Sequence, residues 1–175
     1  NIMSRFLITG GAGFIGSNLV HYLLENYKDI EIVNLDKLTY AGNLENLKDL
    51  SNEKRHKFVK GDIKDRELVR EVLKEVDGVI HLAAETHVDR SILYPEDFIY
   101  TDIVGTYILL DEAKKTKIKI FLHVSTDEVY GSIEDGSFNE NSPLNPSSPY
   151  SASKAGADRL AYSYFKTFSV PVIIV

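Results

Sequence analysis

The sequence contains no cysteine among its 175 residues. This absence excludes disulfide bonds, cysteine-based zinc sites, iron–sulfur clusters and a thiol nucleophile. Any chemistry must therefore come from other side chains. The five histidines form no H-E-x-x-H motif or similar spacing, and two of them, His81 and His123, fall inside predicted strands, so we assign no metal site.

The sequence also lacks long apolar runs and basic stretches. No segment approaches the roughly 20 apolar residues that a membrane-spanning helix needs, and the first residues lack the pattern of a signal peptide. The formal net charge of −6, without a basic stripe interleaved with aromatic residues, argues against a nucleic-acid partner. With a hydrophobic content of 43%, the composition is that of a globular protein, and we expect one folded cytoplasmic domain without a membrane role.

Short β-branched runs alternate with longer segments in which apolar residues recur at helical spacing. This alternation predicts an α/β fold, a doubly wound parallel sheet of the Rossmann type with helices on both faces. The six predicted strands cover residues 5–9, 31–36, 57–61, 78–83, 119–125 and 172–175.

Apolar stripes predict four helices between these strands, over residues 15–27, 68–76, about 96–116 and 150–168. The first stripe runs from Ile15 to Tyr27. The only long irregular stretch is residues 131–149, which holds three of the five prolines, and a loop of this length is usually functional or mobile.

A glycine-rich turn joins the first strand to the first helix. Gly11, Gly13 and Gly16 fit the pattern G-x-G-x-x-G, and Gly10 adds a further glycine. Glycine lets the backbone approach a pyrophosphate, which then lies at the positive end of the helix dipole. A purely structural turn is the alternative, but the strand before it and the helix after it favour a dinucleotide site.

An acidic residue, Asp36, ends the second predicted strand. A carboxylate there can accept hydrogen bonds from the adenosine ribose and would repel a 2′-phosphate, so NAD is favoured over NADP. The neighbouring Lys37 leaves NADP open, and a single Asp at a strand end is otherwise an ordinary turn residue. The same alternative applies to Asp62, after the third strand.

Two Y-x-x-x-K pairs occur, Tyr150 with Lys154 and Tyr162 with Lys166, and this spacing puts both side chains on one helix face. Tyr150 starts its helix near the carboxyl edge of the sheet, whereas Tyr162 lies roughly 18 Å further along the axis. Only Tyr150 can therefore reach a cofactor. A nearby ammonium should lower the pKa of its phenol, so that Tyr150 can accept a proton from a sugar hydroxyl.

The residues Thr126, Asp127 and Glu128 follow Ser125 at the carboxyl end of the fifth strand, where ligands bind in open α/β sheets. One protonated and one ionised carboxyl group could supply the acid and the base for eliminating water. An acidic surface turn is an equally good interpretation of the spacing alone.

Five segments, taken together, closely resemble the dTDP-glucose 4,6-dehydratases, which are extended short-chain dehydrogenases/reductases. They are residues 9–16 (TGGAGFIG), 34–43 (NLDKLTYAGN), 81–90 (HLAAETHVDR), 125–131 (STDEVYG) and 150–154 (YSASK). The resemblance covers the whole chain. Asp127 and Glu128 are its most specific part, because sugar epimerases and decarboxylases of the superfamily usually lack this acidic pair.

The resemblance implies a lyase that converts a nucleotide-linked glucose to a 4-keto-6-deoxy sugar in deoxysugar biosynthesis. In this mechanism Tyr150, helped by Lys154, deprotonates the 4-hydroxyl while NAD takes hydride from C4. Glu128 then removes the C5 proton, Asp127 protonates the departing 6-hydroxyl, and hydride returns to C6. Thr126 would hold the 4-oxygen of the sugar.

The resemblance also implies the cofactor contacts. The expected NAD-binding residues are Gly10, Gly11, Gly13, Phe14, Ile15 and Gly16 at the pyrophosphate; Asp36, Lys37, Leu38 and Thr39 at the adenosine ribose; Asp62 and Ile63 at the adenine; and Leu82, Ala83, Ala84, Glu85, Thr86, Thr101, Tyr150 and Lys154 on the nicotinamide side. Thr86 and Thr126 would also touch substrate.

Family members continue past the sixth strand into a second domain that grips the nucleotide, whereas nothing follows Val175. We therefore expect residues 1–175 to be an NAD-binding domain without its substrate domain, with little or no turnover. The family's dimers pair the helices that start near Glu96 and Tyr150, so the resemblance implies a homodimer. A nucleotide-sugar epimerase and a non-catalytic NAD-sensing module remain as alternatives.

Overall fold

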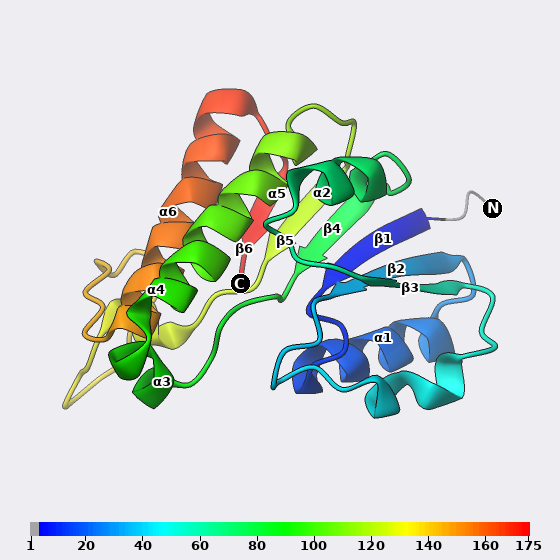
Figure 1. Ribbon diagram of the computed structural model, residues 1–175. Coiled ribbons are helices and arrows are strands. Elements are labelled where there is room, and N and C mark those ends of the chain that lie inside the picture. Colours follow the sequence, from blue (N-terminus) through cyan, green and yellow to red (C-terminus); the bar gives the residue numbers. More distant parts are fainter. Residues whose placement is uncertain (1–3) are drawn as a thin grey trace.

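The computed structural model describes residues 4–175 and contains one sheet of six parallel strands (Figure 1). The strands are β1 (Ser4–Thr9), β2 (Ile30–Asp36), β3 (His56–Lys60), β4 (Gly78–His81), β5 (Ile120–His123) and β6 (Val172–Ile174). Their order is β3-β2-β1-β4-β5-β6, so the direction of winding reverses between β1 and β4. The predicted doubly wound sheet is confirmed, with strand ends that differ by one or two residues.

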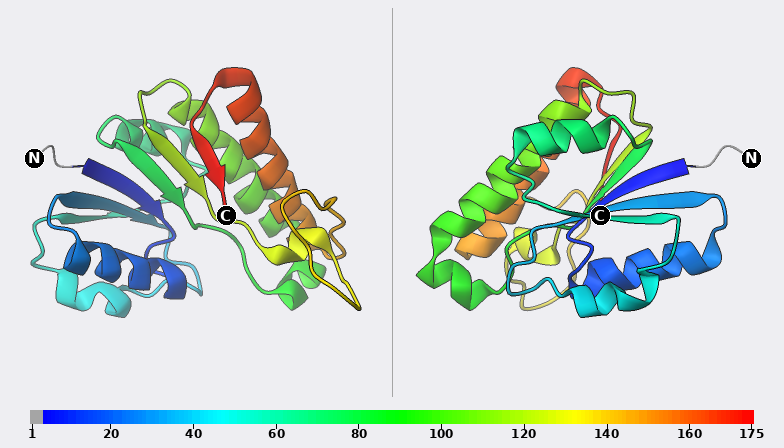
Figure 2. Two further views of the ribbon diagram at one scale, coloured as in Figure 1. Left: turned by 180° about the vertical axis from the view of Figure 1, so that it is seen from behind. Right: turned by 45° about the vertical axis from the view of Figure 1, so that its right-hand side comes forward.

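The helices cover both faces of this sheet. The elements are α1 (Phe14–Asn26), η1 (Leu44–Leu50), α2 (Arg66–Leu73), α3 (Val88–Leu93), α4 (Pro95–Phe98), η2 (Ile99–Gly105), α5 (Thr106–Ala113), η3 (Asp127–Tyr130) and α6 (Pro149–Phe168). Figure 2 shows α1 and η1 beside the β1–β3 half, whereas α5 and α6 lie across the opposite face. Within residues 4–175, no helix combines the length and apolarity needed to cross a membrane.

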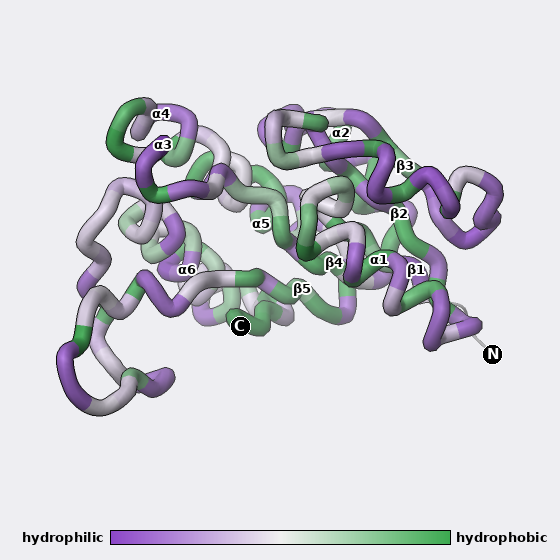
Figure 3. The backbone as a smooth tube through the Cα atoms, turned by 90° about the horizontal axis from the view of Figure 1, so that it is seen from below, coloured by the Kyte–Doolittle hydropathy of each residue, from purple (hydrophilic) through white to green (hydrophobic). Residues whose placement is uncertain are grey.

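Alternating side chains of the strands build two separate cores, as expected for a sheet covered on both faces. Leu7 and Val33 pack with apolar residues of α2, α5 and α6 in the larger core. Ile8 and Ile32 point the other way and pack against α1 and η1. In Figure 3 the hydrophobic colour follows strands such as β5, while hydrophilic colour is concentrated in outer loops.

Several predicted elements need correction. The helix predicted over residues 96–116 is a continuous run of α4, the π-helical η2 and α5, and the short elements α3, η1 and η3 were not predicted. Ile15 and Tyr27, predicted on the buried stripe of α1, are 65% and 47% exposed. Ile15 lies in the first turn and lines a cavity, while Tyr27 follows the end of the helix and packs edge-on against Tyr22.

Candidate functional site

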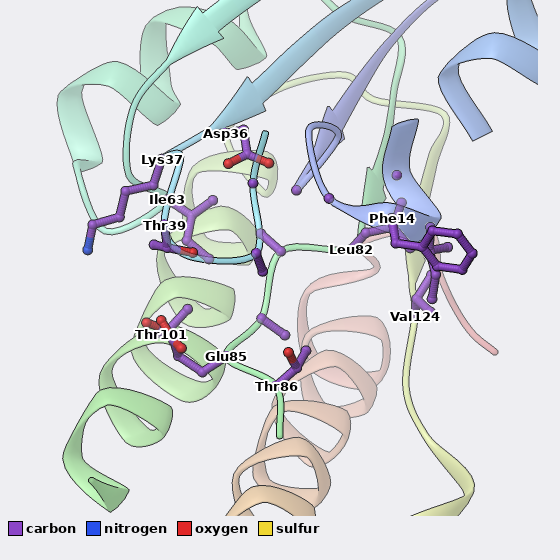
Figure 4. Close-up of a pocket in the computed structure, with 18 of the residues that line it drawn as sticks. Phe14, Asp36, Lys37, Thr39, Ile63, Leu82, Glu85, Thr86, Thr101 and Val124 are labelled. Carbon is purple, nitrogen blue, oxygen red and sulfur yellow. The ribbon is translucent and has the colours of Figure 1, made fainter. Parts of the chain in front are cut away.

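A cavity of about 500 Å³ lies at the carboxyl edge of the sheet, where the winding direction reverses. Its wall comes from the β1–α1 turn, from the segments that follow β2, β3, β4 and β5, and from η2 and α6. Ligands bind at this place in open α/β sheets, and the volume is in the usual range of small-molecule pockets. In Figure 4, Asp36, Lys37 and Thr39 lie on one side of the cavity, with Phe14 and Val124 on the other.

The glycine-rich turn forms the floor of this cavity. Gly10 has a φ of +74°, and a Cβ atom there would lie 2.8 Å from the backbone nitrogen of Ala83, so glycine is required for the turn. Gly13 precedes α1, and within residues 4–175 no side-chain hydrogen bond caps the start of that helix. Because uncapped amides at a helix N-terminus attract anions, the turn is suited to a pyrophosphate.

Asp36 ties the glycine-rich turn to the loop after β2. Its Oδ2 accepts a hydrogen bond of 2.9 Å from the backbone of Ala12, and its Oδ1 accepts one of 2.8 Å from the backbone of Leu38. Each carboxylate oxygen has a second acceptor position, so Asp36 can still receive a ligand hydroxyl. Asp36 can therefore hold the backbone of Ala12 and Leu38 and still accept a hydrogen bond from a ribose hydroxyl, as predicted.

An ion pair between Lys37 and Asp62 forms part of the cavity wall beside β3. The Lys37 ammonium lies 2.8 Å from Asp62 Oδ2. Burial by itself would raise the pKa of Asp62, but hydrogen bonds from Lys37 and from the backbone of Lys64 outweigh it and lower this pKa. Lys37 is therefore directed to Asp62 and is not free to meet a 2′-phosphate without breaking this pair.

Helix α6 begins at the cavity and carries Tyr150 and Lys154 into its wall. Pro149 occupies the first turn, and the side chain of Ser148 accepts a hydrogen bond from the backbone of Ser151 in a capping box. The Lys154 ammonium is almost completely buried and donates a hydrogen bond of 2.7 Å to the carbonyl oxygen of Val124. The cap thus fixes the start of α6 and, with it, the positions of the Tyr150 and Lys154 side chains.

The expected effect of the ammonium on the phenol is wrong in this structure. Burial raises the pKa of Tyr150, and the negative charges of Glu128 and Asp127 act in the same direction. A hydrogen bond with the side chain of Thr126 opposes them. Lys154 is not among the main influences on this pKa, and its ammonium donates its hydrogen bond to the carbonyl oxygen of Val124.

The residues Thr126, Asp127 and Glu128 begin the 3₁₀ turn η3, just beyond the cavity wall. Thr126 caps this turn by accepting a hydrogen bond of 3.3 Å from the backbone of Glu128. Both carboxylates are exposed, yet they are close enough to affect the Tyr150 phenol electrostatically. The phenol, the threonine hydroxyl and the acidic pair therefore lie on one side of the molecule, beside the cavity.

Most residues predicted to bind a cofactor surround the cavity. Those in its wall are Gly10, Gly13, Phe14, Ile15, Gly16, Asp36, Lys37, Thr39, Asp62, Ile63, Leu82, Ala83, Ala84, Glu85, Thr86, Thr101, Tyr150 and Lys154. Gly11 and Leu38 are not part of the wall. Gly11 packs against the side chain of Asn34, and Leu38 packs against the core between the sheet and α1.

Other lining residues received no role from the sequence. They are Leu35, Ala41, Gly42, Gly61, His87, Val124 and Ser125. Most of these residues follow a strand end or lie in the loop after β2, and this position could have identified them in the sequence. His87 instead lies just before α3. A buried acid, Asp102, was also not predicted. It interrupts the apolar side of the helical run between Phe98 and Thr106 and is only 2% exposed. An acid in such a stripe is an unusual pattern that could have identified it.

The sequence is similar to those of several known proteins. A model of the GDP-mannose 4,6 dehydratase family matches residues 7–175. The Low-salt glycan biosynthesis protein Agl12 of Haloferax volcanii is 54% identical, covering 96% of this chain and 54% of its relative. A dTDP-glucose 4,6-dehydratase of Streptomyces antibioticus is 53% identical, covering 96% of this chain and 51% of its relative.

Solved structures separate two kinds of relatives. DesIV, a dTDP-glucose 4,6-dehydratase from Streptomyces venezuelae with NAD bound, has a TM-score of 0.94 at 50% identity, covering 97% of this chain and 54% of that one. A UDP-glucuronic acid 4-epimerase from Bacillus cereus has a TM-score of 0.90 at 32% identity, covering 97% and 55% of the two chains. The resemblance to dTDP-glucose 4,6-dehydratases is thus confirmed, although the chain spans about half the length of the curated relatives it matches. Because the family model covers nearly all of residues 4–175, the chain belongs to the GDP-mannose 4,6 dehydratase family.

Proposed function

We propose that this chain is the NAD-binding part of a lyase of the dTDP-glucose 4,6-dehydratase type. The observation that carries the proposal is the grouping of Thr126, Asp127 and Glu128 around the Tyr150 phenol, beside the cavity at the sheet edge. An oxidation needs only the phenol and a cofactor, whereas elimination of water also needs an acid and a base. The lower identity to the 4-epimerase supports the same choice.

The residues around the cavity fit a dinucleotide. The uncapped amides of α1 and the cavity beside Gly13 would hold the pyrophosphate. Asp36 would accept hydrogen bonds from the adenosine ribose, and Asp62 with Ile63 would meet the adenine. Residues 82–86, Thr101, Tyr150 and Lys154 would line the nicotinamide side. When bound, NAD would accept hydride from C4 of the sugar and return it to C6.

The proton transfers would fall to this chain's own side chains. Tyr150 would take the proton of the 4-hydroxyl. Because burial raises the pKa of its phenol, the phenolate form would depend on stabilisation by the hydrogen bond with Thr126. The ketone formed at C4 makes the C5 proton acidic, so the Glu128 carboxylate can remove it. Asp127, in its protonated form, would give a proton to the departing 6-hydroxyl, which leaves as water. When hydride returns to C6, the protonated Glu128 would give its proton back to C5.

Binding of NAD can be tested directly on the 175-residue chain. We propose the substitution Gly13→Val. A Cβ atom at Gly13 would lie 3.3 Å from the backbone oxygen of Gly10, a close contact that a shift of a few tenths of an ångström would relieve, and circular dichroism checks that the variant is folded. The added methyl groups would occupy the space for the pyrophosphate. Isothermal titration should show NAD binding to the parent chain and to the surface control Lys48→Ala, and no binding to Gly13→Val. Equal binding by all three proteins would contradict the proposed site.

Dehydration can be tested in a full-length protein that contains this chain. Glu128→Gln should reduce formation of the 4-keto-6-deoxy sugar by about 10²-fold or more, as expected for a lost general base. The matched control is Glu134→Gln, in the exposed loop before α6, which should retain activity. If Glu128→Gln instead leaves a C4 epimerisation unaffected, the epimerase is the better assignment. If no sugar reacts while NAD binds, the NAD-sensing module becomes preferable.

The remaining expectations are part of the same proposal. Residues 4–175 would form the NAD-binding domain of a cytoplasmic enzyme, and the rest of a family-length protein would grip the nucleotide of the substrate. Neither nucleic acid nor a membrane is needed for this chemistry. The identity of the nucleotide base would be decided by that second domain.

A homodimer would bury an apolar surface on the side of η2, α5 and α6. This surface contains Ile99, Tyr100, Tyr107, Tyr162 and Phe165, which are between 39% and 50% exposed. Large exposed apolar patches on soluble proteins usually mark contacts with other proteins. Light scattering should give the dimer mass for the parent chain and the monomer mass for Phe165→Glu. The control Tyr22→Glu, on α1, should remain dimeric, and a monomeric parent chain would contradict the proposal.

A further inference from the structure

The buried acid Asp102 connects two parts of the cavity wall that are distant in sequence. It lies in the π-helical segment η2, and such segments often occur at functional sites. Its Oδ1 accepts a hydrogen bond of 2.8 Å from the backbone of Glu85, and its Oδ2 accepts one of 2.6 Å from the hydroxyl of Ser153. Both carboxylate oxygens are thus used inside the protein.

The two partners of Asp102 belong to the nicotinamide side of the cavity. Glu85 and the adjacent Thr86 are part of the segment that follows β4 and lines the cavity. Ser153 lies on α6 directly before Lys154, and its hydroxyl is also 2.8 Å from the carbonyl oxygen of Tyr150. One carboxylate therefore holds the cavity segment and the first turns of α6 in a fixed relation.

Asp102 also supplies charge near Lys154. A buried ammonium is costly unless negative charge compensates it. Burial lowers the pKa of Lys154, and the two carboxylates of Asp102 and Asp158 oppose this effect. The ammonium donates its hydrogen bond to Val124, so Asp102 acts on it across space and not through direct contact.

Three other ionisable groups lie near Lys154, and their charges and contacts differ from those of Asp102. His81 and His123 are buried, and burial lowers their pKa values, so they contribute no positive charge at neutral pH. Asp158 accepts a hydrogen bond of 2.6 Å from Ser125, and His123 Nε2 lies 3.1 Å from its other carboxylate oxygen. Burial raises the pKa of Asp102 to about 6, and the group is still mainly ionised at neutral pH.

We propose that Asp102 is a positioning residue of the reaction site: it fixes the segment after β4 against the start of α6 and compensates the charge of the Lys154 ammonium. This inference rests on the proposed function, because Tyr150 and Lys154 have their catalytic meaning only there. Its two parts, the hydrogen bonds and the charge, can be separated by two substitutions at the same position.

Asp102→Asn removes the charge and keeps the shape. The amide oxygen can still accept from Glu85, and the amide nitrogen can donate to Ser153, whose hydroxyl can turn toward Tyr150. The titration of Lys154 can be followed by NMR in the 175-residue chain labelled with ¹³C at lysine Cε, with Lys154→Arg to assign its signal. In Asp102→Asn the titration midpoint of Lys154 should move to lower pH. In the control Asp111→Asn, whose carboxylate binds Arg66, Lys114 and Lys115, this midpoint should not move. An unchanged midpoint in Asp102→Asn would overturn the role of the charge.

Asp102→Leu removes the hydrogen bonds as well. We expect the Glu85 amide to exchange its hydrogen at least about tenfold faster, and NADH to bind about tenfold more weakly, than in the parent chain. Binding can be followed by NADH fluorescence, since the chain has no tryptophan.

If the Glu85 amide of Asp102→Leu exchanges at the parent rate and the variant binds NADH as the parent chain does, the positioning role is wrong. If Asp102→Leu does not fold, the midpoint in Asp102→Asn decides. If the parent chain does not bind NADH, the proposed function fails while the lysine titration still tests Asp102.

Discussion

At the scale of single residues, Asp36 holds two backbone segments together at the position that we propose for cofactor specificity. Its carboxylate holds the backbone of Ala12 and of Leu38, so it is already oriented before a ligand arrives. A preorganised acceptor binds ribose hydroxyls without further ordering, and its charge repels a 2′-phosphate. Lys37, which could have favoured that phosphate, is paired with Asp62.

The substitution Asp36→Asn should therefore reduce discrimination between cofactors. The amide lacks the negative charge and can accept through only one of its two ends, so NADH should bind more weakly while NADPH gains relative to it. We expect the ratio of the two dissociation constants to change by about tenfold, equivalent to about 1.4 kcal/mol. Fluorescence titrations with NADH and NADPH measure this ratio, and Lys60→Ala, at the end of β3, serves as a surface control. An unchanged ratio would show that Asp36 does not select the cofactor.

Several site residues could be predicted one by one from the sequence because each follows a strand end or a helix start. Gly13, Asp36 and Tyr150 are of this kind, and all three lie in the cavity wall. The hydrogen bond from Glu85 to Asp102 could not be predicted, because it joins loop backbone to a side chain through no periodic spacing. The pKa of Tyr150 was misjudged for a related reason: burial depends on how Phe98 and the neighbouring helices pack around the ring.

At the scale of elements, periodicity predicted the presence of helices better than their type. The run from Pro95 to Ala113 has one mainly apolar side, which Asp102 interrupts, and this pattern fits α, π and mixed helices equally well over such a short distance. Hydrogen bonding from residue i to i+5 in η2 leaves no signature in the sequence pattern. The short α3 escaped prediction because six residues, Val88–Leu93, are too few to show a helical period.

The start of α6 should be sensitive to its cap. Ser148 and Ser151 form a capping box, and removing the hydroxyl of Ser148 leaves the Ser151 amide without its acceptor. We expect Ser148→Ala to lower the free energy of unfolding by about 1 kcal/mol in urea denaturation. Ser163→Ala is the matched control, because this hydroxyl donates to Leu160 within the same helix and caps nothing. Equal stability of both variants would argue against the capping role.

Helices α2 and α5 are joined by an ion cluster with a predictable response to pH. The Glu112 carboxylate, 1% exposed, binds Arg66 and Arg70 of α2 together with Lys115. Burial by itself would raise the pKa of Glu112, but hydrogen bonds from these three cations outweigh it and hold the pKa at about 2. A depressed carboxyl pKa stabilises the fold above the unfolded value, and this contribution is lost as the pH falls toward the folded value.

Glu112→Gln should therefore lower the free energy of unfolding by about 2 kcal/mol at pH 7. The difference from the parent chain should shrink as the pH falls from 4.5, the ordinary value for Glu, toward about 2. Urea denaturation at several pH values measures it. Glu71→Gln is the control, since its pair with Lys74 is exposed and should contribute little. A difference that does not depend on pH would contradict the assigned pKa.

At the scale of the whole molecule, the cavity lies between the two halves of the sheet. One part of its wall follows β1, β2 and β3, and the other follows β4 and β5 or belongs to η2 and α6. The two cores lie on opposite faces of the sheet, one against α1 and η1 and the other against α2, α5 and α6, and both contain side chains of β1 and β2. A ligand that touches both parts of the wall should therefore stabilise both halves of the sheet together.

Saturation with NAD should make this coupling measurable. A ligand at 100 times its dissociation constant raises the free energy of unfolding by about 2.7 kcal/mol, which for a chain of this size corresponds to an increase in Tm of about 5 to 10 °C. Amides of β2, beside α1, and of β5, beside α6, should both exchange more slowly with NAD present. In Gly13→Val neither change should occur. Protection confined to one half would mean that the ligand binds only part of the cavity, because a dinucleotide held at the glycine-rich turn and beside Tyr150 must contact both halves.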